Sequence, residues 1–112
     1  MSDDAWQVFD LEDIKGRLTQ SKPVEYREFL RVPALSCGVY HLAAGSTDMQ
    51  TPHDEDEVYM VMEGRARLKL GGRIHEVKPG TVMYVRATES HSFFEIDEDM
   101  TLLVFFAASG PS

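Results

Sequence analysis

After Pro23 the hydrophobic positions gather in short segments rich in β-branched and aromatic residues, which Gly and Pro interrupt at intervals of about ten residues, and in some segments they alternate with polar positions. The clearest segment is Arg65 to Leu70, where apolar side chains alternate with Arg65, Arg67 and Lys69. This period of two predicts a strand with one face in a core and the other in water. From their β-branched and aromatic residues and the breaks between them, strands are predicted over residues 24–32, 36–43, 57–62, 65–70, 73–77, 81–85, 91–96 and 101–107. That number of strands favours an all-β sandwich or barrel.

Two turns and a short helix complete the predicted elements. Leu70-Gly71-Gly72-Arg73 predicts a tight hairpin, because Gly tolerates the positive φ that such turns require. Pro79-Gly80 favours a type II turn for the same reason at its second residue. Before the strands, apolar residues recur at helical spacing from Leu11 to Leu18, and Asp10 can cap them. We therefore expect a short helix within an N-terminal extension of residues 1–22.

Composition narrows the class of protein. The 112 residues include 19 acidic and 11 basic side chains, a formal net charge of −8 and one cysteine. This length indicates a single domain over residues 1–112, with a β-barrel over residues 23–108. The negative field repels phosphates, so nucleic acid and anionic membranes are not expected as partners. The single cysteine and the acidic start, with no apolar run behind it, favour a cytoplasmic location.

The segment from Leu102 to Phe106 differs from the other predicted strands because it is apolar without alternation. Both of its faces should therefore be covered, either within the fold or by a second copy of the chain. We take this as an indication of a homodimer. The apolar run is far shorter than the roughly 20 residues that span a bilayer, so no membrane segment is predicted.

One histidine lies in an acidic stretch, Thr51-Pro52-His53-Asp54-Glu55-Asp56-Glu57. In a straight strand four residues advance about 13 Å, whereas two donors on one metal each lie about 2.1 Å from it. His53 and Glu57 could therefore bind one ion only if the chain turns between them. Residues 54–56 are poor strand formers that favour turns, which suits such a reversal.

Glu57 has the parity of Tyr59 and Val61, which places its carboxylate at the edge of a buried cavity. A buried, unpaired carboxylate is unfavourable, so it should protonate, pair with a cation or bind a metal. His91 opens a later strand with Phe93 on the same face and offers the missing partner. Tyr59 and Phe93 are then candidate walls of the cavity.

Two motifs in this region resemble those of the cupins, small β-barrels of jelly-roll type. The first family motif has the spacing of Gly45, Thr51, His53, Glu57 and Gly64, with Thr51 in place of a histidine. The second has the spacing of Gly80, Arg86, Thr88, His91 and Glu95 and keeps only Gly80 and His91. The resemblance covers the chain from about Val24 onward and implies an all-β, cupin-type jelly-roll barrel that follows the short N-terminal helix.

In the family these positions usually hold one divalent metal inside the barrel, so the resemblance implies His53, Glu57 and His91 as metal ligands. The fourth ligand stays open among Gln50, His41 and Thr51, the last through water. Two histidines and one carboxylate with open positions is the arrangement of non-haem iron oxygenases. The metal would be a divalent transition ion, with Fe, Mn, Ni and Zn as the alternatives.

The sequence leaves three functions open. The first is an enzyme, a metal-dependent dioxygenase or isomerase that acts on a small organic molecule in the cavity. The second is a non-catalytic module that binds or senses a small ligand, with the metal structural or absent. The third is a metal-free barrel that self-associates through Leu102 to Phe106. No catalytic residue and no substrate can be assigned at this point.

Overall fold

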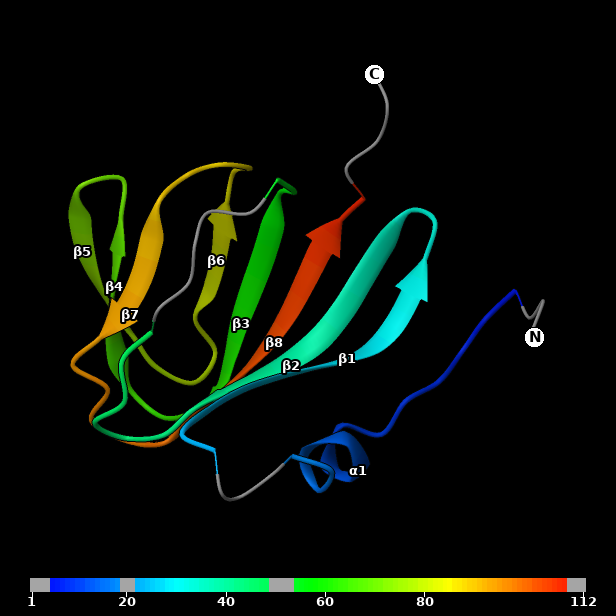
Figure 1. The fold of residues 1–112 in the computed structure, drawn as a ribbon, viewed down its shortest axis with the longest axis horizontal. Coiled ribbons are helices and arrows are strands. Elements are labelled where there is room, and N and C mark those ends of the chain that lie inside the picture. The colour runs from blue at the N-terminus through cyan, green and yellow to red at the C-terminus, as the bar shows by residue number, and fades with distance from the viewer. Residues whose placement is uncertain (1–4, 19–21, 49–53, 109–112) are drawn as a thin grey trace.

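A computed structural model describes residues 5–18, 22–48 and 54–108, and within them the chain forms one helix and eight strands (Figure 1). Each predicted strand is present, with its ends shifted by at most two residues. The elements are α1 (Leu11–Lys15), β1 (Val24–Val32), β2 (Leu35–Leu42), β3 (Glu57–Glu63), β4 (Ala66–Leu70), β5 (Arg73–Val77), β6 (Val82–Val85), β7 (His91–Phe94) and β8 (Met100–Ala107).

The strands form two antiparallel sheets. One has five strands in the order β1-β2-β8-β3-β6, and the other has three in the order β5-β4-β7. Figure 1 shows the smaller sheet at the left and the larger one running from the centre to the right. Strands β3 and β7 belong to different sheets, so residues on their inner faces can meet across the interior. This all-β architecture is the predicted one.

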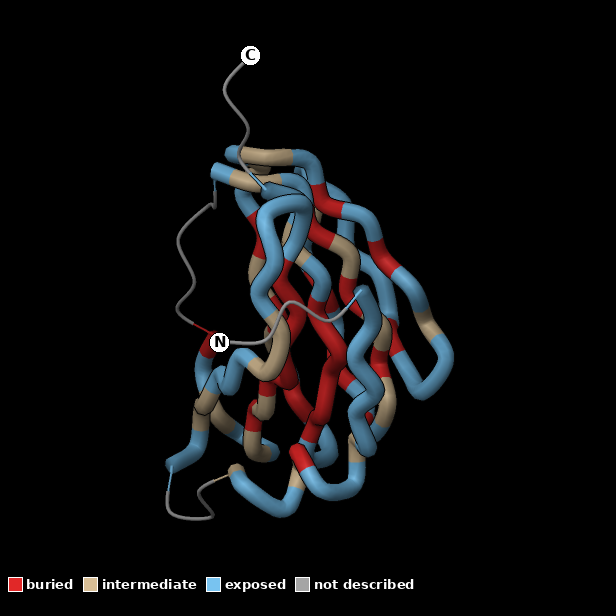
Figure 2. The backbone as a smooth tube through the Cα atoms, turned by 90° about the vertical axis from the view of Figure 1, so that its right-hand side faces the viewer, coloured by how far each residue is buried: buried red, intermediate tan, exposed pale blue. Residues whose placement is uncertain are grey.

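Alternation along the strands builds the core between the two sheets. In β4, Ala66 and Leu68 are buried while Arg67 and Lys69 are exposed, as the pattern predicts. Figure 2 shows the buried positions in red, concentrated along the strands. Each fully buried aliphatic or aromatic side chain contributes about 1.5–3 kcal/mol. The buried residues of this core are Tyr40, Leu42, Tyr59, Val61, Ala66, Leu68, Val77, Met83, Val85, Phe93, Ile96, Met100, Leu102 and Val104.

Both predicted turns are present. Gly71 and Gly72 have φ of 57° and 79°, and they join β4 to β5 in a hairpin whose last pair is Leu70 with Arg73. At Pro79-Gly80, Gly80 has φ of 92° and Thr81 N donates to Lys78 O at 2.9 Å. Positive φ at the third turn residue is the mark of a type II turn.

The N-terminal helix is shorter than predicted. Asp10 caps it, since its side chain accepts a hydrogen bond from Glu12 N at 2.9 Å. The helix ends at Lys15, because Gly16 follows and is a poor helix former. Ile14 is buried on the outer face of the five-stranded sheet, where Leu18 also packs. No helix among the described residues is long and apolar enough to cross a membrane.

The apolar run in β8 is explained largely within the chain itself. β8 lies third in the five-stranded sheet, between β2 and β3. Leu102 and Val104 face the core between the sheets, and Leu103 packs beneath α1. Phe105 is exposed and Phe106 is half-buried. Coverage of residues 102–104 therefore needs no second copy, and the expected homodimer stays a prediction.

Candidate functional site

Glu57 and His91 meet inside the barrel from opposite sheets. Glu57 opens β3 on its inner face, with the same parity as Tyr59, and only 2% of it is exposed. His91 opens β7 and is buried as well. Glu57 Oε1 lies 3.0 Å from His91 Nε2. The structure thus brings two of the three predicted ligand residues together.

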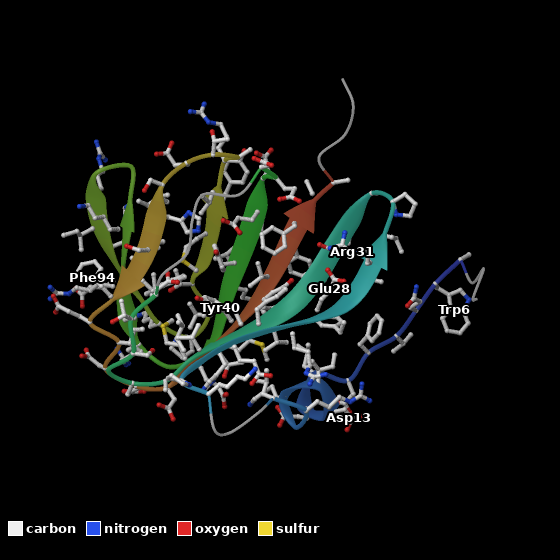
Figure 3. The ribbon with its side chains drawn as sticks, in the orientation of Figure 1. Trp6, Asp13, Glu28, Arg31, Tyr40 and Phe94 are labelled. Atoms are coloured by element: carbon white, nitrogen blue, oxygen red, sulfur yellow. The ribbon has the colours of Figure 1, made fainter. Side chains whose placement is uncertain are left out.

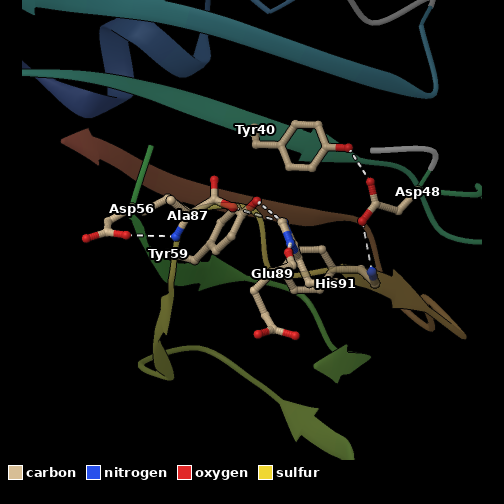
Figure 4. Close-up of polar contacts among 9 residues, drawn as sticks. Tyr40, Asp48, Asp56, Tyr59, Ala87, Glu89 and His91 are labelled. Atoms are coloured by element: carbon tan, nitrogen blue, oxygen red, sulfur yellow. Dashed lines mark hydrogen bonds and ion pairs between the residues drawn. The ribbon is translucent and has the colours of Figure 1, made fainter. Parts of the chain in front are cut away.

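Hydrogen bonds fix the orientation of the His91 ring (Figure 4). Its Nδ1 lies 3.0 Å from the main-chain oxygen of Glu89. A carbonyl oxygen can only accept, so Nδ1 carries the hydrogen and Nε2 is the nitrogen that turns inward. Nε2 also lies 3.1 Å from the hydroxyl of Tyr59. Metal-binding histidines commonly donate their second ring N–H to a carbonyl in this way.

One oxygen of the Glu57 carboxylate has no partner in the part of the chain that the structure describes. Glu57 Oε2 is buried and makes no hydrogen bond with the described residues. An orphaned, buried carboxylate oxygen costs about 1–3 kcal/mol or more, because a charged group loses its water. An imidazole nitrogen and an unsatisfied carboxylate oxygen side by side form a donor set that fits a divalent transition metal.

The same pair perturbs the titration of His91. Burial lowers its pKa, but the hydrogen bond to Glu57, the Glu89 carbonyl and the nearby carboxylate charges outweigh burial, so the pKa is raised above 6.5. The pair therefore attracts positive charge, either as a proton on His91 or as a bound cation.

The other predicted ligands do not join this pair in the described part of the chain. His53, Gln50 and Thr51 lie outside the described residues. His41 lies on the opposite face of β2, in a polar depression with Lys15 and Glu63, because alternate residues of a strand point to opposite faces. The structure does not bring His41 to the site. Within residues 5–18, 22–48 and 54–108 no group of three or more His, Cys, Asp or Glu side chains could hold a metal.

Both predicted wall residues border the pair. Tyr59 and Phe93 are fully buried, and their rings meet edge to face with centroids 5.4 Å apart. The Tyr59 ring also contacts the His91 ring, at 5.8 Å between centroids. Tyr59 is thus more than packing, because its hydroxyl hydrogen-bonds the inward nitrogen of His91. Its parity with Glu57 was the signal for that role.

A second buried polar pair was not predicted from the sequence. Asp48 accepts a hydrogen bond from the hydroxyl of Tyr40 at 2.7 Å and another from Phe93 N at 2.8 Å (Figure 4). Burial, followed by the hydrogen bond to Asp48, raises the pKa of Tyr40. Asp48 thus links β2, through Tyr40, to β7, through Phe93, which lies two residues after His91. Nothing in the local sequence distinguishes this aspartate from the solvated ones.

Two positions at which this chain departs from the second motif have an unusual backbone conformation. Thr88 has φ of 67° and Glu95 has φ of 47°. These are the only non-glycine residues with positive φ in the described part of the chain. Glycine and asparagine are the residues that adopt this conformation most readily. The fold therefore enforces the conformation on less suitable side chains.

Comparison with known proteins gives the class. The family model described as "Cupin domain" matches residues 38–106. A relative from Streptomyces coelicolor, the uncharacterized protein SCO3923, is 46% identical over 101 residues, which cover 90% of this chain and 95% of the relative. The chain belongs to the cupin family.

Solved structures show the same fold at low sequence identity. The protein TT1209 from Thermus thermophilus matches with a TM-score of 0.74 and 22% identity, over 92% of this chain and 98% of that one. The DMSP lyase DddQ from Ruegeria pomeroyi matches with a TM-score of 0.74 and 17% identity, over 96% of this chain and 57% of the lyase. At these identities the likeness shows the fold alone.

Proposed function

We propose that this cupin holds one divalent transition metal through Glu57, His91 and His53 and acts there on a small organic molecule. The observation that supports the proposal is the buried contact of 3.0 Å between Glu57 Oε1 and His91 Nε2, beside a Glu57 oxygen that has no partner among the described residues. His53 enters through its place in the first cupin motif. A cytoplasmic location remains a prediction.

A metal relieves a conflict within the pair. With its hydrogen on Nδ1, neutral His91 presents a lone pair to a carboxylate oxygen, and two acceptors at 3.0 Å repel each other. A cation shared by Nε2 and the carboxylate turns this repulsion into attraction. A proton on Nε2 would do the same, so metal and proton compete for the pair.

When bound, the metal would supply Lewis-acid polarisation or oxygen activation. The chain's own residues shape what surrounds it. Tyr59 and Phe93 close the interior with aromatic rings, and the Tyr59 hydroxyl is the neutral donor nearest the pair. Glu89 holds the His91 ring through its carbonyl. The aromatic rings favour a small molecule with an apolar body.

Metal content tests the proposal. After tag removal and reconstitution with Fe, Mn, Ni or Zn in turn, the wild-type protein should carry close to one ion per chain. Glu57→Gln and His91→Ala should lose it while circular dichroism shows that they stay folded. His75→Ala is the matched control, because His75 is exposed on β5 and should leave metal content unchanged. Wild-type protein without metal under every condition would contradict the proposal.

The pH dependence of metal occupancy is a second test of the proposal. Histidine must be neutral to bind metal, so occupancy should fall as pH is lowered from 7 to 5. Occupancy that is unchanged at pH 5 would exclude histidine ligation. Oxygen uptake and product analysis with the metal-loaded protein then separate an enzyme from a ligand-binding module. A loaded protein that binds small molecules without converting any of them would support the module.

A further inference from the structure

The inward nitrogen of His91 is in contact with two oxygen atoms that come from β3. Glu57 Oε1 lies 3.0 Å from His91 Nε2, and the hydroxyl oxygen of Tyr59 lies 3.1 Å from the same nitrogen (Figure 4). Glu57 and Tyr59 are two residues apart in one strand, so both side chains leave β3 on its inner face. A carboxylate, an imidazole and a phenol hydroxyl therefore meet in one buried region of the barrel.

The two distances match the spacing of neighbouring ligand atoms on one metal ion. An octahedral ion holds its ligands at about 2.1 Å, so two ligand atoms at right angles lie about 3.0 Å apart. The contacts of His91 Nε2 with Glu57 and Tyr59 have this spacing already. Hydrogen bonds have a similar length, so the question is what becomes of the Tyr59 hydroxyl when an ion binds His91.

The hydrogen bond between Tyr59 and His91 cannot persist once a metal binds Nε2. His91 Nδ1 carries the ring hydrogen because it faces the Glu89 carbonyl, so Nε2 accepts a hydrogen bond from the Tyr59 hydroxyl. A metal uses the same lone pair of Nε2. The hydroxyl then loses this acceptor, while its own oxygen lone pairs remain beside the ion.

Packing holds the Tyr59 side chain at this position. Only 1% of Tyr59 is exposed, and its ring meets the rings of Phe93 and His91 edge to face, with centroids 5.4 and 5.8 Å away. Its main chain pairs with Met83 of β6 on one side and Val104 of β8 on the other. A donor that is fixed in this way loses little conformational entropy when it binds an ion.

The sequence leaves one ligand position for such a donor. The first cupin motif of this chain has Thr51 where the family has a histidine. His41, a candidate for the fourth ligand, lies on the face of β2 that points away from the site. A tyrosine oxygen is an iron ligand in other proteins.

We propose, on the basis of the metal site proposed above, that Tyr59 is a ligand of the metal, and that its phenol oxygen takes the place of the missing histidine. The O–H bond breaks as the oxygen–metal bond forms, and the proton is released to water, as with other protein ligands that bind deprotonated. The donor set is then one carboxylate oxygen, one phenol oxygen and the imidazole nitrogens of His91 and His53.

The affinity for Zn²⁺ distinguishes a ligand from a competitor. Zn²⁺ is titrated into metal-free protein in the presence of a chromophoric chelator. Tyr59→Phe keeps the ring and should bind Zn²⁺ at least tenfold more weakly, because even indirect partners of a metal site contribute tenfold or more. A hydroxyl that only competes for His91 Nε2 would give tighter binding in Tyr59→Phe. Tighter or unchanged binding would overturn the proposal.

Ferric iron reports the ligand directly, because a phenol oxygen bound to Fe³⁺ absorbs visible light, whereas carboxylate and imidazole ligands do not. Wild-type protein loaded from ferric citrate should show this absorption, and Tyr59→Phe with the same iron content should lack it. Tyr40→Phe is the matched control. Figure 3 shows Tyr40 among the side chains of the interior, and this second buried tyrosine bonds Asp48 through its hydroxyl. Tyr40→Phe should keep the absorption.

The outcomes separate this proposal from the metal site on which it rests. Wild-type protein that binds neither Zn²⁺ nor Fe³⁺ would contradict both. Wild-type protein that binds Fe³⁺ without visible absorption would keep the metal site and overturn only the role of Tyr59, even if Tyr59→Phe failed to fold. Absorption that persists in folded Tyr59→Phe would overturn it as well. Circular dichroism shows which variants are folded.

Discussion

Removal of the Tyr40 hydroxyl should destabilise the barrel measurably, because that group joins two buried polar side chains. Tyr40 and Asp48 are both buried, and the bond between them is 2.7 Å long (Figure 4). Tyr40→Phe keeps the ring in the core and deletes only this donor. Asp48 would retain its second hydrogen bond, from Phe93 N.

The magnitude follows from the charge of the acceptor. A hydrogen bond to a charged group contributes about 1.5–3 kcal/mol to the free energy of unfolding. A domain of this size loses roughly 4 °C of Tm per kcal/mol. Tyr40→Phe should therefore melt roughly 6–12 °C below wild type at pH 7. Calorimetry and thermal circular dichroism measure this directly.

Tyr26→Phe is the matched control. The Tyr26 ring contacts the Tyr40 ring edge to face at 6.4 Å, but Tyr26 is partly exposed at the rim. Loss of its hydroxyl should change the free energy of unfolding by no more than about 0.5 kcal/mol. Equal melting temperatures for wild type and Tyr40→Phe would show that the Tyr40–Asp48 bond contributes nothing net, which would refute the reasoning.

The Tyr40 hydroxyl should also make the stability of the protein depend on pH in the alkaline range. The pKa of Tyr40 is raised in the folded state, by burial and then by Asp48, so the folded protein holds this proton more tightly than the unfolded chain. Its contribution is fully present below the unfolded pKa of about 10 and is lost as pH rises above that value. Stability should thus decline less steeply above pH 10 in Tyr40→Phe than in wild type.

Three further changes test other parts of the fold. Thr88→Gly should stabilise the protein by about 0.5–1 kcal/mol, because a β-branched residue is strained at φ of 67°. Gly64→Ala should destabilise it by several kcal/mol, on the order of an overpacked core site, because the new Cβ would lie 2.3 Å from the main-chain oxygen of Asp99. Glu63→Gln should cost up to about 1 kcal/mol at pH 7, through loss of the 2.8 Å ion pair with Lys15. The pKa of Glu63 is lowered, first by its hydrogen bond to Lys15, so this cost should vanish as pH falls below about 4.

Urea unfolding measures all three, each against a matched substitution. Thr47→Gly changes an exposed threonine without positive φ and should destabilise slightly, through backbone entropy. Gly45→Ala probes a glycine with open space around it, so its smaller cost isolates the clash at Gly64. Glu28→Gln removes a pair with Arg31 within one strand and should leave the docking of α1 unchanged. Equal effects within any of these pairs would contradict the stated cause.

Local physics lets much of the fold be read from the chain. Gly and Pro interrupt strands locally, which is why the strand ends agree with the prediction within two residues. Alternation with period two depends only on the geometry of a strand, which is why β4 buries the expected face. The hairpin at Gly71-Gly72 depends on φ of adjacent residues alone. Because Glu57 and Tyr59 lie two residues apart in one strand, they share a face, which predicts that the Glu57 carboxylate lies inside the barrel.

Only the tertiary structure decided what depends on contacts between distant residues. Asp48 is buried because it accepts hydrogen bonds from Tyr40 and Phe93, which lie on two different strands. The tertiary structure placed His41 on the face of β2 that points away from the site, because Tyr40 and Leu42 take the face of β2 that packs into the core. Residues 102–104 are covered by α1 on one face and by the opposing sheet on the other, whereas Val82 and Tyr84 of the edge strand β6 stay exposed. The periodicity of the sequence predicts which side chains share one face of a strand. Which residues that face contacts depends on how the strands and the helix pack, so only the tertiary structure shows it.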